Sequence, residues 1–385
     1  MIRIPVKYCV RSLMQRPWRS VLTITGVGLS VFLSVMMLGL SQGLMKSNLA
    51  SGEDLNVIAL SKGAEALEFS ALDPTAYNIL AGSMGVAQQD GQPLARPEAY
   101  VNSLVKLAGS GVEPQPVLAR GILDQTGFAM HPQVSLKAGV WPQRGYQVAV
   151  GQLVATRLGL AADALEPGMT LEFEGGSWEI TGLLDAAGTV FEAEIWTQLD
   201  DLMVASRHDD YSAVLLRAAD ATALEDLLYD LETRTDARSS PVVESEYFAA
   251  NASQIKPVQM VTYIMSLLLI SGGLMAGMNT MFNSILGRTR EMAVLLVMGY
   301  KRTGVLTGFI LESVMLCLAG GAVGCLLGSL LNGMPMNFTM GAFRFQVDLG
   351  VLAVGIGLAA MIGFFGALVP VLRVARLQAV EGLRH

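Results

Sequence analysis

The chain has 385 residues, of which 52% are hydrophobic and only 15% are charged, and its formal net charge is −7. Soluble domains carry about 25% charged residues, so this composition argues against an ordinary soluble enzyme or binding module. A membrane protein is the favoured interpretation, and a soluble protein with unusually buried helices is the alternative.

Four long apolar stretches share a single formal charge, that of Glu312. They are residues 21–45, 257–287, 303–343 and 349–372. A helix needs about 20 apolar residues to cross the hydrocarbon core of a bilayer, and each stretch is long enough. The sequence therefore predicts a membrane α-helical protein with four transmembrane helices and one large water-exposed domain between the first and the second.

The charges are distributed unevenly between this domain and the rest of the chain. Residues 46–256 contain 13 Lys and Arg against 29 Asp and Glu, a net charge of −16, whereas the remainder has a net charge of +9. Basic residues collect on the cytoplasmic side of membrane proteins. Both termini and the loop between the second and third helices should therefore be cytoplasmic, with the acidic domain outside.

The predicted order along the chain is a cytoplasmic or interfacial helix (1–19), TM1 (20–46), a periplasmic domain (47–256), TM2 (257–287), a cytoplasmic segment (288–302), TM3 (303–333), a periplasmic loop (334–348), TM4 (349–372) and a cytoplasmic tail (373–385). The basic start is compatible with an interfacial helix and with a simple topology signal. An uncleaved signal anchor is favoured over a cleavable signal peptide, because the apolar run is long and no small-x-small cleavage site follows it.

Glycines recur four residues apart inside the apolar stretches, which lets helix backbones approach closely. They are Gly39 and Gly43, Gly273 and Gly277, and Gly320, Gly324 and Gly328. We expect helix packing at the second and third groups in particular, although glycine is common in membrane helices. For Glu312, a structural partner is favoured over a proton-coupling role.

The outer domain should mix strands and helices. We expect strands at 56–60, 147–150, 170–173, 178–183 and 212–216, and a helix at 221–234. This is an α+β pattern. The domain has no cysteine to pair, so its fold should depend on an apolar core.

The outer domain contains few residues that could carry catalysis. His131 and His208 are its only histidines, and no serine lies in a G-x-S-x-G setting. Acidic pairs such as Asp200 and Asp201 could bind a cation, but a solvated acidic surface explains them more simply. We expect no catalytic residues, no bound metal and no enzymatic activity.

One segment is specific enough to suggest a family. Residues 288–302, RTREMAVLLVMGYKR, resemble the cytoplasmic element of FtsX-like ABC transporter permeases, the group that contains MacB, LolC and LolE, and DevC. The similarity continues through Glu312 and the glycines from Gly320 to Gly328. Residues 11–23 resemble the family's entry to its first helix, and 370–384 resemble its last turn, with Ala379 and Gly382 departing from the pattern.

The outer domain resembles the periplasmic domain of MacB in the order of its weaker motifs. These are residues 136–141, 148–151, 167–168, 178–182 and 194–196. The resemblance implies an extracytoplasmic α+β domain of MacB periplasmic type. Together with the four helices, it spans nearly the whole chain.

The resemblance also implies how the chain works. In such permeases, the cytoplasmic segment seats in a groove of a separate ATPase. The residues that would make this contact are Arg288, Thr289, Arg290, Glu291, Met292, Leu295, Leu296, Met298, Gly299, Tyr300, Lys301 and Arg302. The alternative is that Leu295 and Leu296 pack under the protein's own helices.

No Walker motif G-x-x-x-x-G-K-[ST] occurs in the sequence, and such a loop is what cradles nucleotide phosphates. We therefore expect ATP and Mg on a cytoplasmic ABC ATPase partner and no cofactor on this chain. The other expected partners are a second permease subunit, identical or related, a periplasmic adaptor and the lipid bilayer; no nucleic acid is expected.

The function that this resemblance implies is that of a permease subunit in a MacB-like (type VII) ABC transporter of the inner membrane. It would couple ATP hydrolysis to a periplasmic conformational change by mechanotransmission, for export or extraction of a lipid, lipoprotein or amphiphile. The alternative is an FtsX-like signalling subunit that activates a cell-wall hydrolase.

Overall fold

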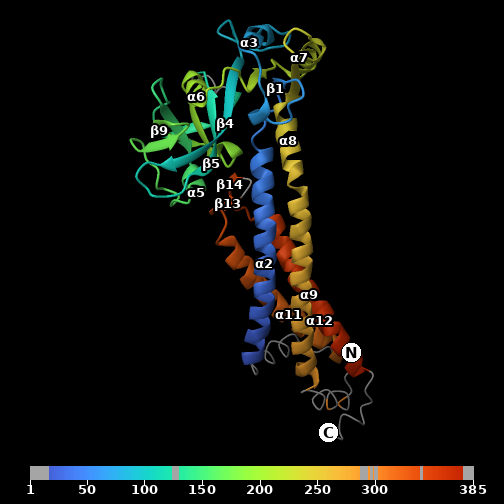
Figure 1. Ribbon diagram of the computed structural model, residues 1–385. Helices are drawn as coiled ribbons and strands as arrows, with labels where there is room; N and C mark the ends of the chain where they lie inside the picture. Colours follow the sequence, from blue (N-terminus) through green and yellow to red (C-terminus); the bar gives the residue numbers. More distant parts are fainter. Residues whose placement is uncertain are drawn as a thin grey trace. The chain divides into compact units, whose positions relative to one another are not determined.

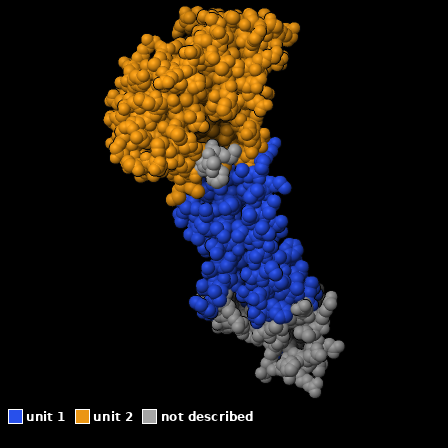
Figure 2. Space-filling model, in the orientation of Figure 1, with its two compact units in different colours: residues 1–42, 256–333, 345–385 blue, residues 43–255, 334–344 orange. Residues whose placement is uncertain are grey.

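The computed structural model describes residues 17–123, 130–286, 294, 298, 302–338 and 341–375. The chain divides into two compact units (Figure 2), which are described separately. Unit 1 comprises residues 1–42, 256–333 and 345–385, and unit 2 comprises residues 43–255 and 334–344.

Unit 1 is built from long apolar helices. They are α2 (Pro17–Leu49, as far as residue 42), α9 (Lys256–Leu286), α11 (Arg302–Ser329) and α12 (Leu349–Ala375). Within the described residues, four helical segments are long and apolar enough to cross a membrane: Ser20–Leu49, Lys256–Thr280, Thr303–Ser329 and Leu349–Leu372. The four spans predicted from composition are therefore present as helices.

Small residues determine how these helices pack. A Cβ at Gly324 would lie 2.5 Å from the carbonyl oxygen of Gly28 on α2, and a Cβ at Gly321 would lie 2.4 Å from the side-chain Cβ of Ala359 on α12. The α11 helix therefore packs closely against both α2 and α12. Between these helices, Val27, Val31 and Cys317 belong to a shared buried cluster.

Unit 2 contains a ten-stranded mixed sheet (Figure 1). Its strands are β1 (Asn56–Ser61), β4 (Ala95–Leu107), β5 (Gln115–Ile122), β6 (Ser135–Gly139), β7 (Gln147–Gly151), β8 (Thr170–Phe173), β9 (Gly176–Asp185), β10 (Glu194–Gln198), β11 (Ala213–Arg217) and β12 (Ser239–Val243). Short pairs form apart from it: β2 (Gln88–Gln89) with β3 (Gln92–Pro93), and β13 (Pro335–Phe338) with β14 (Gly341–Arg344).

Six of the strands close into a ring. The pairings run β4–β5, β5–β10, β10–β7, β7–β9, β9–β8 and β8–β4, with β5–β10 and β7–β9 parallel and the rest antiparallel. A closed ring leaves no free edge among these strands. One apolar cluster, which includes Val148, Val150, Trp178 and Ile195, belongs to this ring.

The remaining strands extend the sheet and are covered by helices. Val57 and Leu216 pack against Leu80 of α3 (Pro74–Ala81) and against Leu227 of α7 (Ala221–Thr233). Asp220 starts α7 by accepting hydrogen bonds from the backbone N–H groups of residues 222 and 223. The other described helical elements of unit 2 are η1 (Leu67–Phe69), α5 (Val154–Arg157), η2 (Val190–Ala193), α6 (Leu199–Ser206) and α8 (Glu244–Gln254).

The secondary structure expected for the outer domain is largely confirmed. The five predicted strands correspond to β1, β7, β8, β9 and β11, and the predicted helix corresponds to α7, each within about two residues at its ends. The longest strand, β4, its partner β5 and the hairpin β13–β14 were not predicted. In β4, Pro97, Glu98, Asn102 and Ser103 interrupt the apolar alternation on which the prediction depended.

Candidate functional site

A buried ionic cluster occupies one face of the closed ring in unit 2. Successive residues of a strand point to opposite faces of a sheet. Ala99, Ala119 and Ile195 therefore face one apolar cluster. Tyr100, Arg120 and Trp196 face the other side, and they lie opposite one another because Tyr100 pairs with Arg120 and Arg120 with Trp196 in the strand register.

Arg120 is at the centre of this cluster. Its Nε donates to Oε2 of Glu194 at 2.8 Å, its Nη2 to Oε1 of Glu194 at 3.2 Å, and its Nη1 to Oε2 of Glu98 at 3.1 Å. Tyr100 donates its hydroxyl to Glu98, and Trp196 donates Nε1–H to Glu194 at 2.9 Å. Arg120 is only 1% exposed, so this is a fully buried, hydrogen-bonded ion cluster.

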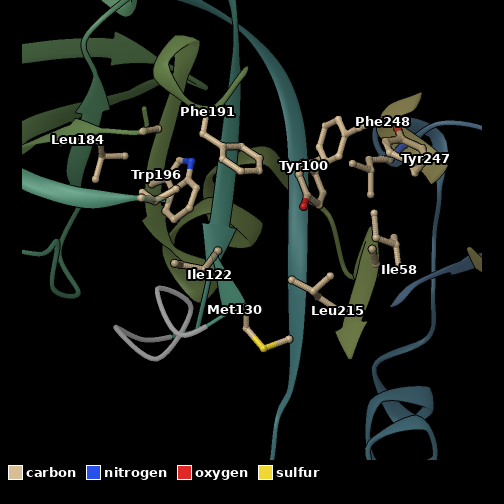
Figure 3. Packing of buried hydrophobic residues seen from close by; sticks show 14 of the residues in the cluster. Ile58, Tyr100, Ile122, Met130, Leu184, Phe191, Trp196, Leu215, Tyr247 and Phe248 are labelled. Carbon is tan, nitrogen blue, oxygen red and sulfur yellow. The ribbon is translucent and has the colours of Figure 1, made fainter. Parts of the chain in front are cut away.

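Aromatic rings enclose the guanidinium group. Its Cζ lies 4.6 Å from the ring centre of Tyr100, 4.7 Å from that of Phe191 and 5.1 Å from that of Trp196. Figure 3 shows Tyr100, Phe191 and Trp196 within the same buried group of side chains. Cation–π attraction is stronger when the cation is desolvated, so the rings add to the attraction from the two carboxylates.

The electrostatics keep Arg120 charged. Burial acts to lower the pKa of Arg120, but Glu194, Tyr100 and Glu98 together raise that pKa above its usual range. Burial raises the pKa of Glu98, and the attraction of Arg120 offsets this only in part. Burial also raises the pKa of Tyr100 well above 10.

A second buried acidic group lies at the start of α8. Oε2 of Glu244 accepts from the backbone N–H of Glu53 at 3.1 Å and from Nδ2 of Asn56 at 2.8 Å. Burial raises the pKa of Glu244 to about 8, although both hydrogen bonds act to lower it. Burial, with Arg120 and Arg217, lowers the pKa of nearby His131 well below 6.5. At neutral pH both groups are mainly uncharged, so their 3.6 Å contact is not an ion pair.

The short helix η2 connects the ionic cluster around Arg120 to other parts of unit 2. The backbone N–H of Val190 donates to Oγ of Ser51 at 3.0 Å, and the carbonyl of Glu192 accepts from the N–H of Leu153 at 2.7 Å. Phe191 lies against Arg120. The segments that follow α2 and β7, and the ionic cluster, therefore all contact residues 190–192.

The hairpin β13–β14 also contacts η2. Nε of Arg344 donates to Oε2 of Glu192 at 2.8 Å, and Nη2 donates to Oε1 of Gln152 at 2.7 Å. At the other strand, Nη1 of Arg157 donates to Oδ1 of Asn337 at 3.0 Å, while Nδ2 of Asn337 donates to the carbonyl of Arg157 at 3.2 Å. The hairpin is thus held to α5 and η2 by polar contacts at both of its strands.

The hairpin also lies against the end of α2. A Cβ at Gly43 would lie 2.4 Å from the carbonyl oxygen of Arg344 and 2.9 Å from the ring of Phe343. Only glycine allows this approach. The Gly39 and Gly43 pair noted in the sequence thus contacts the segment after α11, since a Cβ at Gly39 would lie 2.6 Å from the ring of Phe345 in unit 1.

A cavity of about 250 Å³ adjoins these contacts. Its walls combine apolar side chains such as Phe248 and Phe343 with polar ones such as Asn102 and Arg157. Within the described ranges, no group of three or more His, Cys, Asp or Glu side chains is arranged to hold a metal ion.

Most of the predicted ATPase-contact residues lie outside the described residues. These are Arg288, Thr289, Arg290, Glu291, Met292, Leu295, Leu296, Gly299, Tyr300 and Lys301. Met298 lies in a turn and is 59% exposed, and Arg302 is the first residue of α11. The proposed contact with an ATPase therefore stays a prediction.

The glycines expected to pack helices lie as follows. Cβ atoms at Gly320, Gly324 and Gly328 would meet atoms of α2 at 2.7, 2.5 and 2.5 Å, respectively. A Cβ at Gly273 would lie 2.9 Å from Oγ of Ser30, and one at Gly277 would be in ordinary contact, 3.6 Å from Ile362. Glu312 is buried within unit 1, with 8% of its surface exposed.

The buried ionic cluster was not predicted from the sequence. Its signal is a charged residue enclosed by apolar neighbours, as for Arg120 in Val117–Ile122 and for Glu192 and Glu194 in Phe191–Trp196. A charge in such a run must either face solvent or be paired in the interior. Its partner lies 74 residues away along the chain, a separation that a local pattern cannot reveal.

Comparison with known families decides the assignment of the chain. The model described as a MacB-like periplasmic core domain matches residues 20–234, more than half of the chain, and the model described as an FtsX-like permease C-terminal domain matches residues 263–379. The chain belongs to the FtsX-like ABC transporter permeases with a MacB-like periplasmic core domain. The predicted family and fold class are confirmed: an α-helical membrane permease with four candidate spans and a MacB-type α/β domain.

Several relatives of this permease are similar over part of their length. The macrolide export ATP-binding/permease protein MacB of Bordetella avium is 32% identical over 120 residues, which is 31% of this chain and 18% of that protein. The ABC transporter permease YknZ of Bacillus subtilis is 26% identical over 228 residues, 57% of this chain and 55% of that protein. The matched part is thus less than two thirds of either relative.

Two solved structures also match the permease. The extracellular domain of YknZ from Gram-positive bacteria aligns with a TM-score of 0.38 and 14% identity, over 49% of this chain and 99% of that one. The periplasmic region of MacB from Actinobacillus actinomycetemcomitans aligns with a TM-score of 0.39 and 11% identity, over 53% of this chain and 94% of that one.

Proposed function

We propose that this permease is the membrane subunit of a MacB-like (type VII) ABC transporter complex in the inner membrane. It couples ATP hydrolysis by a separate ATPase to a conformational change of its extracytoplasmic domain. The cargo is a lipid, lipoprotein or other amphiphile that is exported or extracted from the membrane. The observation that carries this proposal is the match of the FtsX-like permease model to residues 263–379, which include the whole segment 288–302.

The charge distribution supports the orientation. Residues 46–256 have a net charge of −16 and the rest of the chain +9. Positively charged loops stay in the cytoplasm. Both termini and residues 288–302 then face an ATPase, and unit 2 faces the extracytoplasmic side, where an adaptor protein can bind it.

The ATPase contact is proposed at residues 288–302. Four of these residues are basic, and Val294 and Met298 expose 46% and 59% of their surfaces. Basic side chains around exposed apolar ones suit a groove with an acidic rim on the partner, because such charges orient a complex while apolar groups supply contact area. ATP and Mg bind to that partner, and two permease chains pair in the complex because two ATP sites form between two ATPases.

Charge reversal tests this contact. The double variant Arg288→Glu and Arg290→Glu should abolish co-purification of the ATPase with the permease. The matched control is Arg144→Glu, since Arg144 lies in unit 2 with its side chain 76% exposed. Intact association in the double variant would refute the proposed contact.

The identity of the extracytoplasmic partner tests the transport role. Cross-linking of the full chain in cell envelopes should capture an adaptor protein on unit 2. Capture of a cell-wall hydrolase in its place would instead indicate the signalling role.

A further inference from the structure

We propose that the cavity of about 250 Å³ in unit 2 binds a neutral sugar ring, one hexopyranose unit of a glycan or of a glycolipid headgroup. All of the residues that line this cavity belong to unit 2, so the site is complete within the outer domain. Sugar recognition would be a function of that domain in addition to the proposed coupling to ATP hydrolysis.

The volume of the cavity suits a single ring. A cavity of about 150 Å³ is large enough for benzene, so a volume of about 250 Å³ admits a six-membered ring together with its hydroxyl groups. Pockets for drug-sized molecules measure about 300–1,000 Å³. A whole lipid is therefore too large for the cavity, and the ligand is one small unit, either free or at the end of a longer molecule.

The buried ionic cluster forms the inner end of the cavity. Arg120 and Glu194 both line it, although they are only 1% and 4% exposed. A guanidinium group carries about five N–H donors, and in the part of the chain that the structure describes, three of those of Arg120 bond to Glu194 and Glu98. The other N–H groups of Arg120 are left for an acceptor on a ligand, and a hydroxyl or ring oxygen is such an acceptor.

Amide groups from three separate elements line the polar part of the wall. Asn48 lies near the end of α2, Asn102 lies on β4 and Asn251 lies on α8. Each amide offers N–H donors and a carbonyl acceptor, and a hydroxyl group both donates and accepts. The neighbouring hydroxyls of one sugar ring can therefore use both kinds of group on this wall.

Tyr247 and Phe248 add an aromatic part to the wall (Figure 3). Their ring centres are 5.5 Å apart and their planes are at 82° to each other. Phe343 lines the cavity as well. A pyranose ring carries C–H groups on its faces and hydroxyls at its rim, so it can pack on apolar side chains while its rim forms hydrogen bonds. The mixed wall matches this distribution of apolar and polar groups.

The charges of the wall argue against other ligands. The lining contains two guanidinium and two carboxylate groups, those of Arg120, Arg157, Glu68 and Glu194, so its formal charge is zero. An anion would meet the carboxylates, and a cation would meet the guanidinium groups. An acyl chain would cover nine polar side chains among the twenty residues of the lining, and burying polar groups without hydrogen bonds is unfavourable. A neutral, hydroxyl-rich ring avoids both costs.

The test uses the full chain in nanodiscs prepared without glycoside detergents, which would compete for the site. Saturation-transfer NMR is recorded with the uncharged sugars methyl β-glucoside, methyl β-galactoside, methyl α-mannoside and N-acetylglucosamine, and empty nanodiscs give the background. At least one sugar should bind with a Kd on the order of 1 mM, because so small a ligand makes few contacts. No signal above background for any of the four at about 20 mM would overturn the inference.

Two related probes test the chemistry of the site. Methyl β-glucuronide adds a carboxylate to the same ring, and cyclohexanol keeps a six-membered ring with a single hydroxyl. Both should bind at least about tenfold more weakly than the best sugar, because the first meets Glu68 and Glu194 and the second leaves the amides unpaired. Equal or tighter binding of either probe would show that the site does not select a neutral sugar.

Nanodiscs that contain a glycolipid with the same ring identify the source of the ligand. Competition between this lipid and the soluble sugar would assign the ring to a membrane glycolipid. Full binding of the soluble sugar in the presence of the lipid would assign it to a soluble glycan. Both outcomes support a sugar site.

Variants test whether the sugar binds in this cavity. The double variant Asn102→Ala and Asn251→Ala should lower the affinity at least about tenfold, because two amide partners are lost. The matched control is Asn78→Ala on α3, an exposed residue outside the cavity, which should leave the affinity unchanged. Ala193→Leu fills part of the cavity and should prevent binding. If the asparagine variant binds as tightly as the wild type, the sugar lies elsewhere and the inference is wrong, even where Ala193→Leu does not fold.

Discussion

Arg120 and Glu194 are joined by two hydrogen bonds, of 2.8 and 3.2 Å, between the neighbouring parallel strands β5 and β10. Both side chains are at least 95% buried. The pair therefore connects the middle of the closed ring to the residue that follows η2.

Replacing this cation should destabilise the domain strongly. Arg120→Met keeps the apolar stem but leaves Glu194 and Glu98 buried without their cation, which should lower the free energy of unfolding by about 3–5 kcal/mol. Thermal unfolding of the detergent-solubilised chain, followed by tryptophan fluorescence, measures this. Lys106→Met is the control, since its pair with Glu172 is about half exposed and should contribute less than about 1 kcal/mol.

Glu244 should make stability depend on pH. Its pKa is about 8 in the folded protein against a reference of 4.5, so between these values the folded state binds more protons than the unfolded state. Stability should therefore fall as pH rises through this window, by up to about 1.4 kcal/mol per pH unit. Glu244→Gln should flatten the dependence.

The window from pH 6.5 to 8 isolates this effect from His131. The pKa of His131 lies well below 6.5 in the folded protein. Its burial therefore destabilises the fold only as pH falls below about 6.5, where the imidazole is protonated in the unfolded chain. Urea unfolding at pH 6.5, 7.2 and 8 is the measurement. Equal midpoints at all three values in the wild type would contradict the assignment.

The approach of Gly324 to Gly28 should make α11 intolerant of side chains on that face. Gly324→Ala places a Cβ 2.5 Å from the carbonyl oxygen of Gly28, and such overpacking costs about 1–3 kcal/mol. Gly357→Ala on α12 is the control, because nothing lies within 4 Å of its Cβ. In an SDS titration followed by circular dichroism, only the first variant should unfold at lower SDS.

A side chain at position 43 should be tolerated equally poorly, for a different reason. A side chain there would displace the backbone of Arg344, so Gly43→Ala should raise hydrogen exchange in β14 while α2 stays helical. Gly26→Ala, on the same helix with open space around its Cβ, should have no effect. Equal exchange in the two variants would show that the hairpin tolerates displacement from α2.

Local patterns in the sequence were sufficient to predict the elements whose apolar residues recur at a regular spacing. The leucines of α7 recur on one face, and Leu227 and Leu231 are buried as this predicts. The hairpin β13–β14 was not predicted because residues 334–348 were assigned as a whole to a periplasmic loop between TM3 and TM4. The strands β4 and β5 were missed because buried charges break their alternation.

The sequence by itself determined the membrane class, the four apolar helices and the permease family, because hydrophobic length, charge and a contiguous motif are all local properties. Only the tertiary structure decided that Arg120 pairs with Glu194, that Gly43 lies against Arg344 and that Arg344 contacts Glu192. These contacts join residues that are 74 to more than 300 positions apart. The reason is physical: which side chains meet in the interior depends on strand register and chain closure, and both follow from packing of the whole domain.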